Sequence, residues 1–139
     1  MKLLVAHDGS EHADKTLEEA VKLATKLGES CVDVIIVVPD LCLVDVGIDE
    51  CNVITSTLYK EAQGTKQKIE QKLASQHCTP KVHIKSGSAE ENILAVAAEL
   101  NSDLIIIGAA GKHGGGRGGL GSVAQKVVGK SKHSVLVIK

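Results

Sequence analysis

Five short segments of strand character alternate with four segments of helical periodicity along this chain, and this order constrains the fold more than any other feature. Four of them, residues 3–6, 34–38, 104–107 and 134–138, are apolar runs, and the fifth, residues 81–85, alternates, with Val82 and Ile84 expected to point inward. Mostly continuous apolar strands that alternate with helices are typical of a parallel sheet covered by helices on both faces. At 139 residues, the chain has the length of one domain. We therefore expect a single α/β domain over residues 1–139.

The ends of the expected helices carry recognisable signals. Ser10 suits the N-cap of a first helix, and Gly28 suits its end. A polar helix is expected over about residues 53–76, after a loop over 40–52, although Gly64 weakens it. Two further helices are expected after Gly87 and from Ser122 to about Val128.

The core must be aliphatic, because the chain has one Tyr and neither Phe nor Trp. Glycine is abundant, with 14 residues, and seven of these fall between Gly108 and Gly119. This concentration marks one loop, which directly follows the most apolar strand, as a special region of the chain.

Charge is distributed unevenly. Residues 1–51 carry 11 acids and 4 bases, whereas the segment from Leu104 to the end carries six bases and no acid. A glycine loop in a basic segment suits a small anion such as phosphate, and a solvated basic face is the alternative. A pI near 6.6 and the scarcity of aromatic side chains argue against nucleic-acid binding.

Other functional classes have little support. No cysteine pair has C-x-x-C spacing, so we expect each of the four cysteines to be an unpaired buried thiol. The six histidines show no metal-ligand spacing. No apolar stretch approaches 18 residues, and the apolar run at the start is too short for a signal sequence. We expect no membrane association and a cytoplasmic location.

Two loops have the chemistry of a binding site, because ligands of open parallel sheets bind beyond the carboxyl ends of strands. These loops are residues 7–10 and residues 108–122. Two nucleotide motifs, one in the second loop and one in the helix that follows it, are weak. The G-x-G-x-x-G match at Gly114 begins well past the strand, and the sequence 129–131 lacks the first glycine of a P-loop, which is replaced by Ala124.

A third spacing fits the predicted elements. Gly108, Gly111, Gly121 and Ser122 have the form G-x2-G-x9-G-[ST], which resembles the nucleotide signature of the universal stress protein family. Further segments that resemble the family follow in the right order, at residues 5–10, 86–93, 103–108, 122–127 and 134–138. The resemblance covers nearly the whole chain except residues 40–76.

The resemblance implies a Rossmann-like, three-layer sandwich of the adenine nucleotide alpha hydrolase-like type, with a five-stranded parallel sheet of order 3-2-1-4-5. It also implies ATP as the ligand, with any magnesium arriving on the nucleotide. Ala6 and Val38 would contact the adenine side, Val38 through its backbone. Asp8 would lie beside the nucleotide, and its alternative role is to brace a turn.

The same resemblance places the phosphates at the glycine loop. Gly108 and Gly111 would lie along the ribose and phosphates. Gly121, Ser122 and Val123 would hold the terminal phosphates, although Ser122 could instead be only a helix N-cap. Lys112 and Arg117 either contact phosphate or are solvated. The chain departs from the family pattern over residues 114–119, which are unusually rich in glycine.

These features favour an ATP-binding regulatory or stress-response module. The alternatives are a slow ATPase, a phosphoryl or nucleotidyl transferase, and a nucleotide-free dimeric scaffold. The sequence leaves enzymatic activity uncertain and favours none, since it shows no positioned base, nucleophile pair or Walker lysine. We also expect a homodimer through the last strand, 134–138, which would lie at a sheet edge. The alternative is a monomer, in which Lys132, His133 and Lys139 at the ends of this strand prevent its edge from pairing with a second copy.

Overall fold

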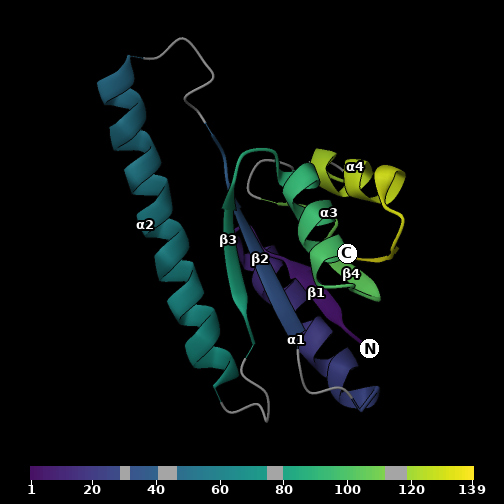
Figure 1. The fold of residues 1–139 in the computed structure, drawn as a ribbon. Helices are drawn as coiled ribbons and strands as arrows, with labels where there is room; N and C mark the ends of the chain where they lie inside the picture. The colour runs from purple at the N-terminus through teal and green to yellow at the C-terminus, as the bar shows by residue number, and fades with distance from the viewer. Residues whose placement is uncertain (29–31, 41–46, 75–79, 112–118) are drawn as a thin grey trace.

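The computed structural model describes residues 1–28, 32–40, 47–74, 80–111 and 119–139 (Figure 1). The strands are β1 (Leu3–Ala6), β2 (Val32–Val38), β3 (Val82–Ser86), β4 (Leu104–Gly108) and β5 (Ser134–Ile138). The helices are α1 (Glu11–Lys26), α2 (Ile48–Leu73), α3 (Ala89–Glu99) and α4 (Ser122–Lys130).

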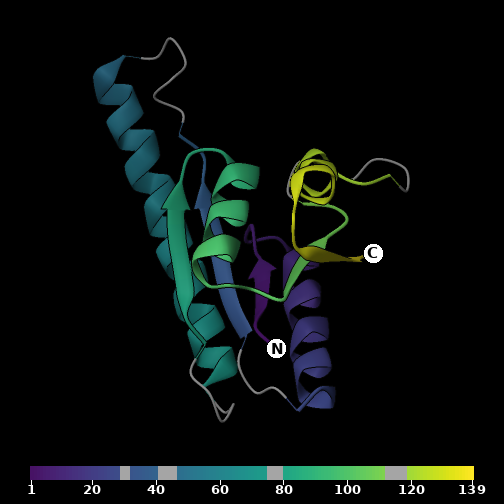
Figure 2. The same cartoon turned by 45° about the vertical axis from the view of Figure 1, so that its right-hand side comes forward.

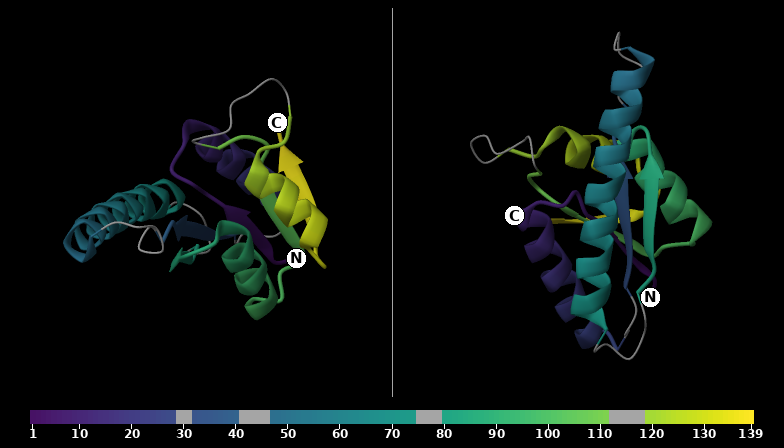
Figure 3. Two further views of the ribbon diagram at one scale, coloured as in Figure 1. Left: turned by 90° about the horizontal axis from the view of Figure 1, so that it is seen from above. Right: turned by 90° about the vertical axis from the view of Figure 1, so that its left-hand side faces the viewer.

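The strands form one parallel sheet of order β3-β2-β1-β4-β5, which confirms the predicted fold class. β1 is the central strand, with Leu3 paired to Val32 of β2 and to Leu104 of β4. Viewed from above, α1 and α2 cover one face of the sheet, and α3 and α4 cover the other (Figure 3, left). The order of the strands reverses between β1 and β4, so the loops after these strands diverge at their carboxyl ends.

Each face of the sheet has its own aliphatic core. Leu3 and Val5 pack with α1 and α2, whereas Leu4 packs with α3 and α4. This alternation follows from strand geometry, in which successive side chains point to opposite faces. Because both faces are covered, β1 and β4 contain no charged residue, and β2 is apolar from Val34 to Val38, which is why these sequences read as continuous runs.

The helix ends match the sequence signals closely. The Ser10 hydroxyl accepts a hydrogen bond from the Ala13 N–H at 3.1 Å and caps α1. Gly28 follows the end of α1 with a φ of +78°, a conformation that favours glycine. Ser88 caps α3 in the same way, by accepting from the N–H of Glu91.

α2 begins earlier than the sequence indicates. It starts at Ile48, inside the segment predicted to be a loop, and its N-terminal half projects past the end of the sheet (Figure 2; Figure 3, right). The periodicity was hidden because Ile48 and Val53 lie on the exposed side, 82% and 66% accessible. Asp49 and Glu50 favour a helix start there through the helix dipole.

The expectation that all cysteines are unpaired thiols is wrong for Cys51. Cys51 is buried in the first turns of α2 and is disulfide-bonded. Short-range spacing does not reveal such a bond, because a disulfide depends on the distance between Cα atoms in the fold. Cys31, Cys42 and Cys78 lie outside the described residues.

Among the described helices, none is both long enough and apolar enough to cross a bilayer.

Two glycines illustrate opposite steric demands. A Cβ atom on Gly108, at the end of β4, would lie 2.7 Å from His12 Cδ2 and 2.9 Å from Thr16 Oγ1 of α1. The His12 ring is itself held, because its Nε2 donates to the Ile138 carbonyl at 3.0 Å. A Cβ atom on Gly64, inside α2, meets nothing within 4 Å.

We therefore predict opposite effects of one substitution at these two positions. Gly64→Ala should raise the free energy of unfolding by about 0.5–1 kcal/mol, because alanine is the better helix former. Gly108→Ala should lower it by roughly 1–3 kcal/mol, because α1 must move away from β4. Urea unfolding of the two variants and the wild type measures both effects, and a destabilised Gly64→Ala variant would contradict the α2 assignment.

Candidate functional site

A cavity of about 230 Å³ lies at the carboxyl ends of the strands. β1, β2, β4, α1, α3 and α4 contribute to its lining. The apolar part of the wall contains Ala6, Ala13, Ile35, Val37, Ala89, Ile93, Ile107, Ala110, Val123 and Ala124. Half of these are alanines, so the apolar wall is built largely from small side chains.

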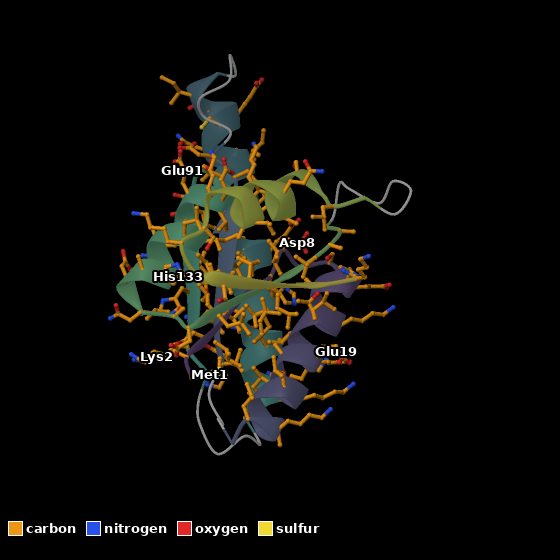
Figure 4. All side chains as sticks on the ribbon, turned by 90° about the vertical axis from the view of Figure 1, so that its right-hand side faces the viewer. Met1, Lys2, Asp8, Glu19, Glu91 and His133 are labelled. Carbon is orange, nitrogen blue, oxygen red and sulfur yellow. The ribbon has the colours of Figure 1, made fainter. Side chains whose placement is uncertain are left out.

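The turn after β1 forms one polar side of this cavity. Asp8 Oδ1 accepts a hydrogen bond from the Ser10 N–H at 2.9 Å, and Gly9 adopts a φ of +86°. Asp8 is exposed and lies beyond the carboxyl end of β1, above Met1 and Lys2 in the view of Figure 4. Its carboxylate therefore sits where the carboxyl ends of the strands open to solvent.

His7 anchors this turn from inside the protein, with only 3% of its surface accessible. Its Nδ1 accepts from the Gly9 N–H at 3.0 Å, and its Nε2 donates to Asp14 Oδ1 at 3.0 Å. Burial lowers the pKa of His7 below 6.5, and this effect outweighs the Asp14 hydrogen bond and charge, which raise it. The ring is therefore neutral at pH 7.

The Asp8 carboxylate approaches the glycine loop closely. A Cβ atom on Gly111 would collide with Asp8 Oδ2. Glycine at this position thus lets the segment after β4 pass directly beside the turn after β1. Two loops that are about a hundred residues apart in the sequence meet here at one edge of the cavity.

The N-terminus of α4 forms the other polar side of the cavity. Gly121 is the N-cap and supplies no side-chain hydrogen bond, while its own N–H donates to the Ala109 carbonyl at 2.7 Å. The interpretation of Ser122 as an N-cap is therefore wrong, since Ser122 is the first residue of the helix. The N–H groups of a helix's first turn, here Ser122, Val123 and Ala124, have no partner within the helix. Such groups and the helix dipole attract anions.

The lysines of α4 lie close to a glutamate of α3. Lys126 Nζ and Lys130 Nζ lie 3.8 and 3.9 Å from Glu90 Oε1. Hydrogen bonds from its own N–H and from Ser88 lower the pKa of Glu90, and the two lysines lower it further. Within the described ranges, no cationic side chain lines the cavity. Lys112 and Arg117 lie outside those ranges, as does the glycine-rich stretch 112–118.

The structure brings together most of the residues that the sequence predicts for the site. Those that line the cavity are Ala6, Asp8, Gly108, Gly111, Gly121, Ser122 and Val123. Val38 does not line it, because its side chain packs in the core under α1 and α2 and its carbonyl accepts from the Gly87 N–H. The adjacent Val37 lines the cavity instead.

Sequence reasoning placed His7 in a candidate binding loop but gave it no role, and it missed Ile35, Ala89 and Ile93 as lining residues. Ala89 and Ile93 were interpreted only as part of a helix. The i, i+2 spacing of Ile35 and Val37 places both on one face of β2, but a strand buried on both faces does not reveal which face a cavity adjoins. No cluster of three metal-ligating side chains occurs among the described residues.

A Rossmann-like parallel sheet with a cavity at its switch point, lined by glycines and by a helix N-terminus, defines a class of small-ligand-binding α/β proteins. The model of the universal stress protein family matches residues 1–139, so this chain belongs to that family. No curated protein matches it significantly.

Solved structures agree with this assignment. The universal stress protein UspA from Lactobacillus plantarum is 26% identical over 100% of this chain and 97% of its own, with a TM-score of 0.86. The hypothetical protein MJ0577 is 29% identical over 99% and 94%, with a TM-score of 0.87. A universal stress protein from Archaeoglobus fulgidus in complex with dAMP is 23% identical over 100% and 98%, with a TM-score of 0.65.

We predict that the Glu90 cluster stabilises the α3–α4 layer beside the cavity in a pH-dependent way. Glu90→Gln should lower the free energy of unfolding at pH 7 by about 0.5–1 kcal/mol. Because the folded-state pKa of Glu90 is depressed, its contribution is present above the unfolded value of 4.5 and is lost as pH falls through the folded value. Urea unfolding at pH 7 and below pH 4.5 measures the difference.

Glu91→Gln is the matched control, since Glu91 lies in the same helical turn and has no lysine among its ion-pair partners within the described residues. Equal losses for the two variants would show that the lysines contribute nothing.

Proposed function

We propose that this protein binds ATP in the cavity and acts as a nucleotide-dependent regulatory module of the stress response. The observation that carries the proposal is the convergence of Gly108, Gly111, Gly121 and Ser122 with Asp8 around one cavity. These residues come from the ends of β1 and β4 and from the start of α4. Their arrangement supports a ligand that has both an apolar group and an anionic group.

The apolar wall suits the adenine. Ala6, Val37 and Ile107 come from three neighbouring strands, and Ile93 comes from α3. Small aliphatic side chains leave room for a planar ring that is held by packing and by backbone groups. The family resemblance assigns this role to the ends of β1 and β2, and we retain Ala6 and transfer the β2 contact from Val38 to Val37.

The start of α4 suits the phosphates. The N–H groups of Ser122 and Val123, the Ser122 hydroxyl and the helix dipole provide donors for terminal phosphate oxygens. We propose that Gly121 contributes by having no side chain, because its own N–H donates to Ala109. Magnesium would arrive with ATP, and we assign it no ligand from this chain.

The relatives support an adenine nucleotide. The Archaeoglobus fulgidus protein is in complex with dAMP and shares this fold. The two ionisable side chains that line the described cavity, His7 and Asp8, are engaged in hydrogen bonds within the turn. This engagement favours binding over turnover as the role of the site.

We predict that ATP stabilises the protein and that Gly121→Val reduces this stabilisation by more than half. At about 100 times its Kd, ATP should add about 2.7 kcal/mol to the free energy of unfolding. This corresponds to a rise of roughly 5–10 °C in Tm. In Gly121→Val the side chain would crowd the start of α4, so the shift should shrink by more than half. Thermal unfolding with ATP, AMP and buffer measures these shifts.

Gly129→Val is the matched control, because Gly129 lies near the end of the same helix and a Cβ atom there meets nothing within 4 Å. It should keep the full ATP shift. The Tm without nucleotide separates a binding defect from a folding defect. The absence of any shift with ATP or AMP in the wild type would refute nucleotide binding.

We also propose a homodimer formed through β5. β5 lies at one edge of the sheet, and its apolar residues Val135–Ile138 are only partly buried. The Ile138 carbonyl accepts from the Ala109 N–H of the segment after β4, so it faces inward. Because peptide groups alternate in direction along a strand, the N–H and carbonyl of Val137 face the open edge. A second copy could pair there.

We predict that Val137→Pro makes the protein monomeric, because it removes one outward donor from the edge. Val137→Thr keeps the donor and the β-branched shape and should remain dimeric. Light scattering of the wild type and both variants gives the molecular masses. A monomeric wild type, or a dimeric proline variant, would show that β5 is not the interface.

A further inference from the structure

Three hydrogen bonds from side chains to the backbone hold the turn that follows β1. His7 Nδ1 accepts from Gly9, Asp8 Oδ1 accepts from Ser10, and Ser10 Oγ accepts from Ala13, at 3.0, 2.9 and 3.1 Å. Each N–H is thus bonded by a side chain two or three residues earlier. Among these three acceptors, the imidazole is the one with an ordinary pKa near physiological pH.

The two partners of His7 define its protonation state. The Gly9 N–H can only donate, so Nδ1 carries no proton, and Nε2 therefore carries the proton and donates to Asp14 Oδ1. Both ring nitrogens are satisfied in this neutral tautomer. The imidazole thereby connects the turn to the first turn of α1.

Protonation breaks this arrangement at one definite atom. A proton on Nδ1 would face the Gly9 N–H across 3.0 Å, so two donors would point at each other. The hydrogen bond to Asp14 survives protonation, whereas the bond to Gly9 does not. The turn would therefore lose one of its three supports, in the segment that places Asp8 against Gly111.

The charged groups that act on the ring come from three elements. Asp14 on α1 and Asp8 in the turn favour the protonated form, whereas burial, the largest effect, and Lys72 on α2 oppose it. The net result is a pKa below the ordinary value of 6.5. The Gly9 bond is therefore intact at pH 7 and above, and it is lost as pH falls below 6.5 through the pKa of the folded protein.

We propose that His7 is a positioning residue that makes nucleotide affinity dependent on pH by holding the Asp8 turn only while its imidazole is neutral. This inference rests on the proposed nucleotide-binding function. His7 acts through Gly9 and Asp8, and no contact between its ring and the nucleotide is required.

Two substitutions separate the two ends of the ring. His7→Asn places an amide oxygen near the position of Nδ1 and keeps an acceptor for Gly9 that does not titrate. His7→Gln places an amide NH2 near the position of Nε2 and keeps a donor for Asp14, but it offers Gly9 no acceptor. The Tm without nucleotide shows whether each variant is folded.

The first experiment is calorimetric titration with ATP from pH 7.5 to pH 5.0. ATP changes its own protonation over this range, so His7→Asn serves as the reference at each pH. We expect wild-type affinity to fall by roughly three- to tenfold more than that of His7→Asn, the ratio that one hydrogen bond produces. His7→Gln should bind more weakly than His7→Asn even at pH 7.5. If the ATP affinities of the wild type and His7→Asn fell by the same factor between pH 7.5 and pH 5.0, the inference would be overturned.

The second experiment needs no nucleotide. In ¹⁵N-resolved NMR spectra of the free protein, the Gly9 amide should shift with the same midpoint as the His7 imidazole, and this shift should be absent from His7→Asn. If the chemical shift of the Gly9 amide did not change as His7 titrates, the inference would be overturned whether or not ATP binds. If ATP fails to bind at every pH, the proposed function is overturned instead, and a Gly9 titration would still show that His7 holds the turn.

Discussion

The position of β1 at the centre of the sheet is the constraint on which the rest of the structure depends. β1 has only four residues, yet it pairs with β2 on one side and β4 on the other. Its side chains enter two different cores, because Leu3 and Val5 point toward α1 and α2 and Leu4 points toward α3 and α4. Among the described elements, β1 is the one strand that pairs with both β2 and β4, and the order of the strands reverses beside it. The cavity follows from this position, since the loops after β1 and β4 leave the sheet side by side.

The glycines of the site serve the protein's own packing as well as any ligand. Gly108 lets α1 approach β4, where His12 and Thr16 occupy the space that a Cβ would need. Gly111 lets the Asp8 carboxylate lie against the backbone of the second loop. Gly108 and Gly111, which belong to the spacing that resembles a nucleotide signature, are thus also required by close contacts within the protein. These contacts join β4 and the segment after it to α1 and to the turn after β1. The same residues define the shape of the cavity before a ligand enters it.

The sequence predicted where helices and strands lie better than it predicted which side of each element faces the cavity. Ser10 and Gly28 indicated the correct ends of α1, because caps and left-handed glycines are local requirements of the backbone. Local signals could not distinguish Val37 from Val38, since β2 is buried on both faces and only the fold decides which face adjoins the cavity. The early start of α2 was missed because its apolar residues Ile48 and Val53 are exposed and show no buried face. The disulfide of Cys51 was missed because cysteine spacing alone does not report the distance between Cα atoms in the fold. His7 was passed over because a single histidine has no recognisable pattern until its two hydrogen-bond partners are known.

The pairing of β1 with β4 also determines when the fold can be completed as the chain is synthesised. Of the five strands, β1 is synthesised before the others, and β2 can pair with one of its edges soon afterwards. The other edge stays unpaired until Leu104–Ile106 have been made, about a hundred residues later. If β1 and β2 pair during that interval, β1 presents an open apolar edge, which is the kind of surface that pairs with other chains. The central strand of the finished protein is therefore the edge strand of its unfinished precursor.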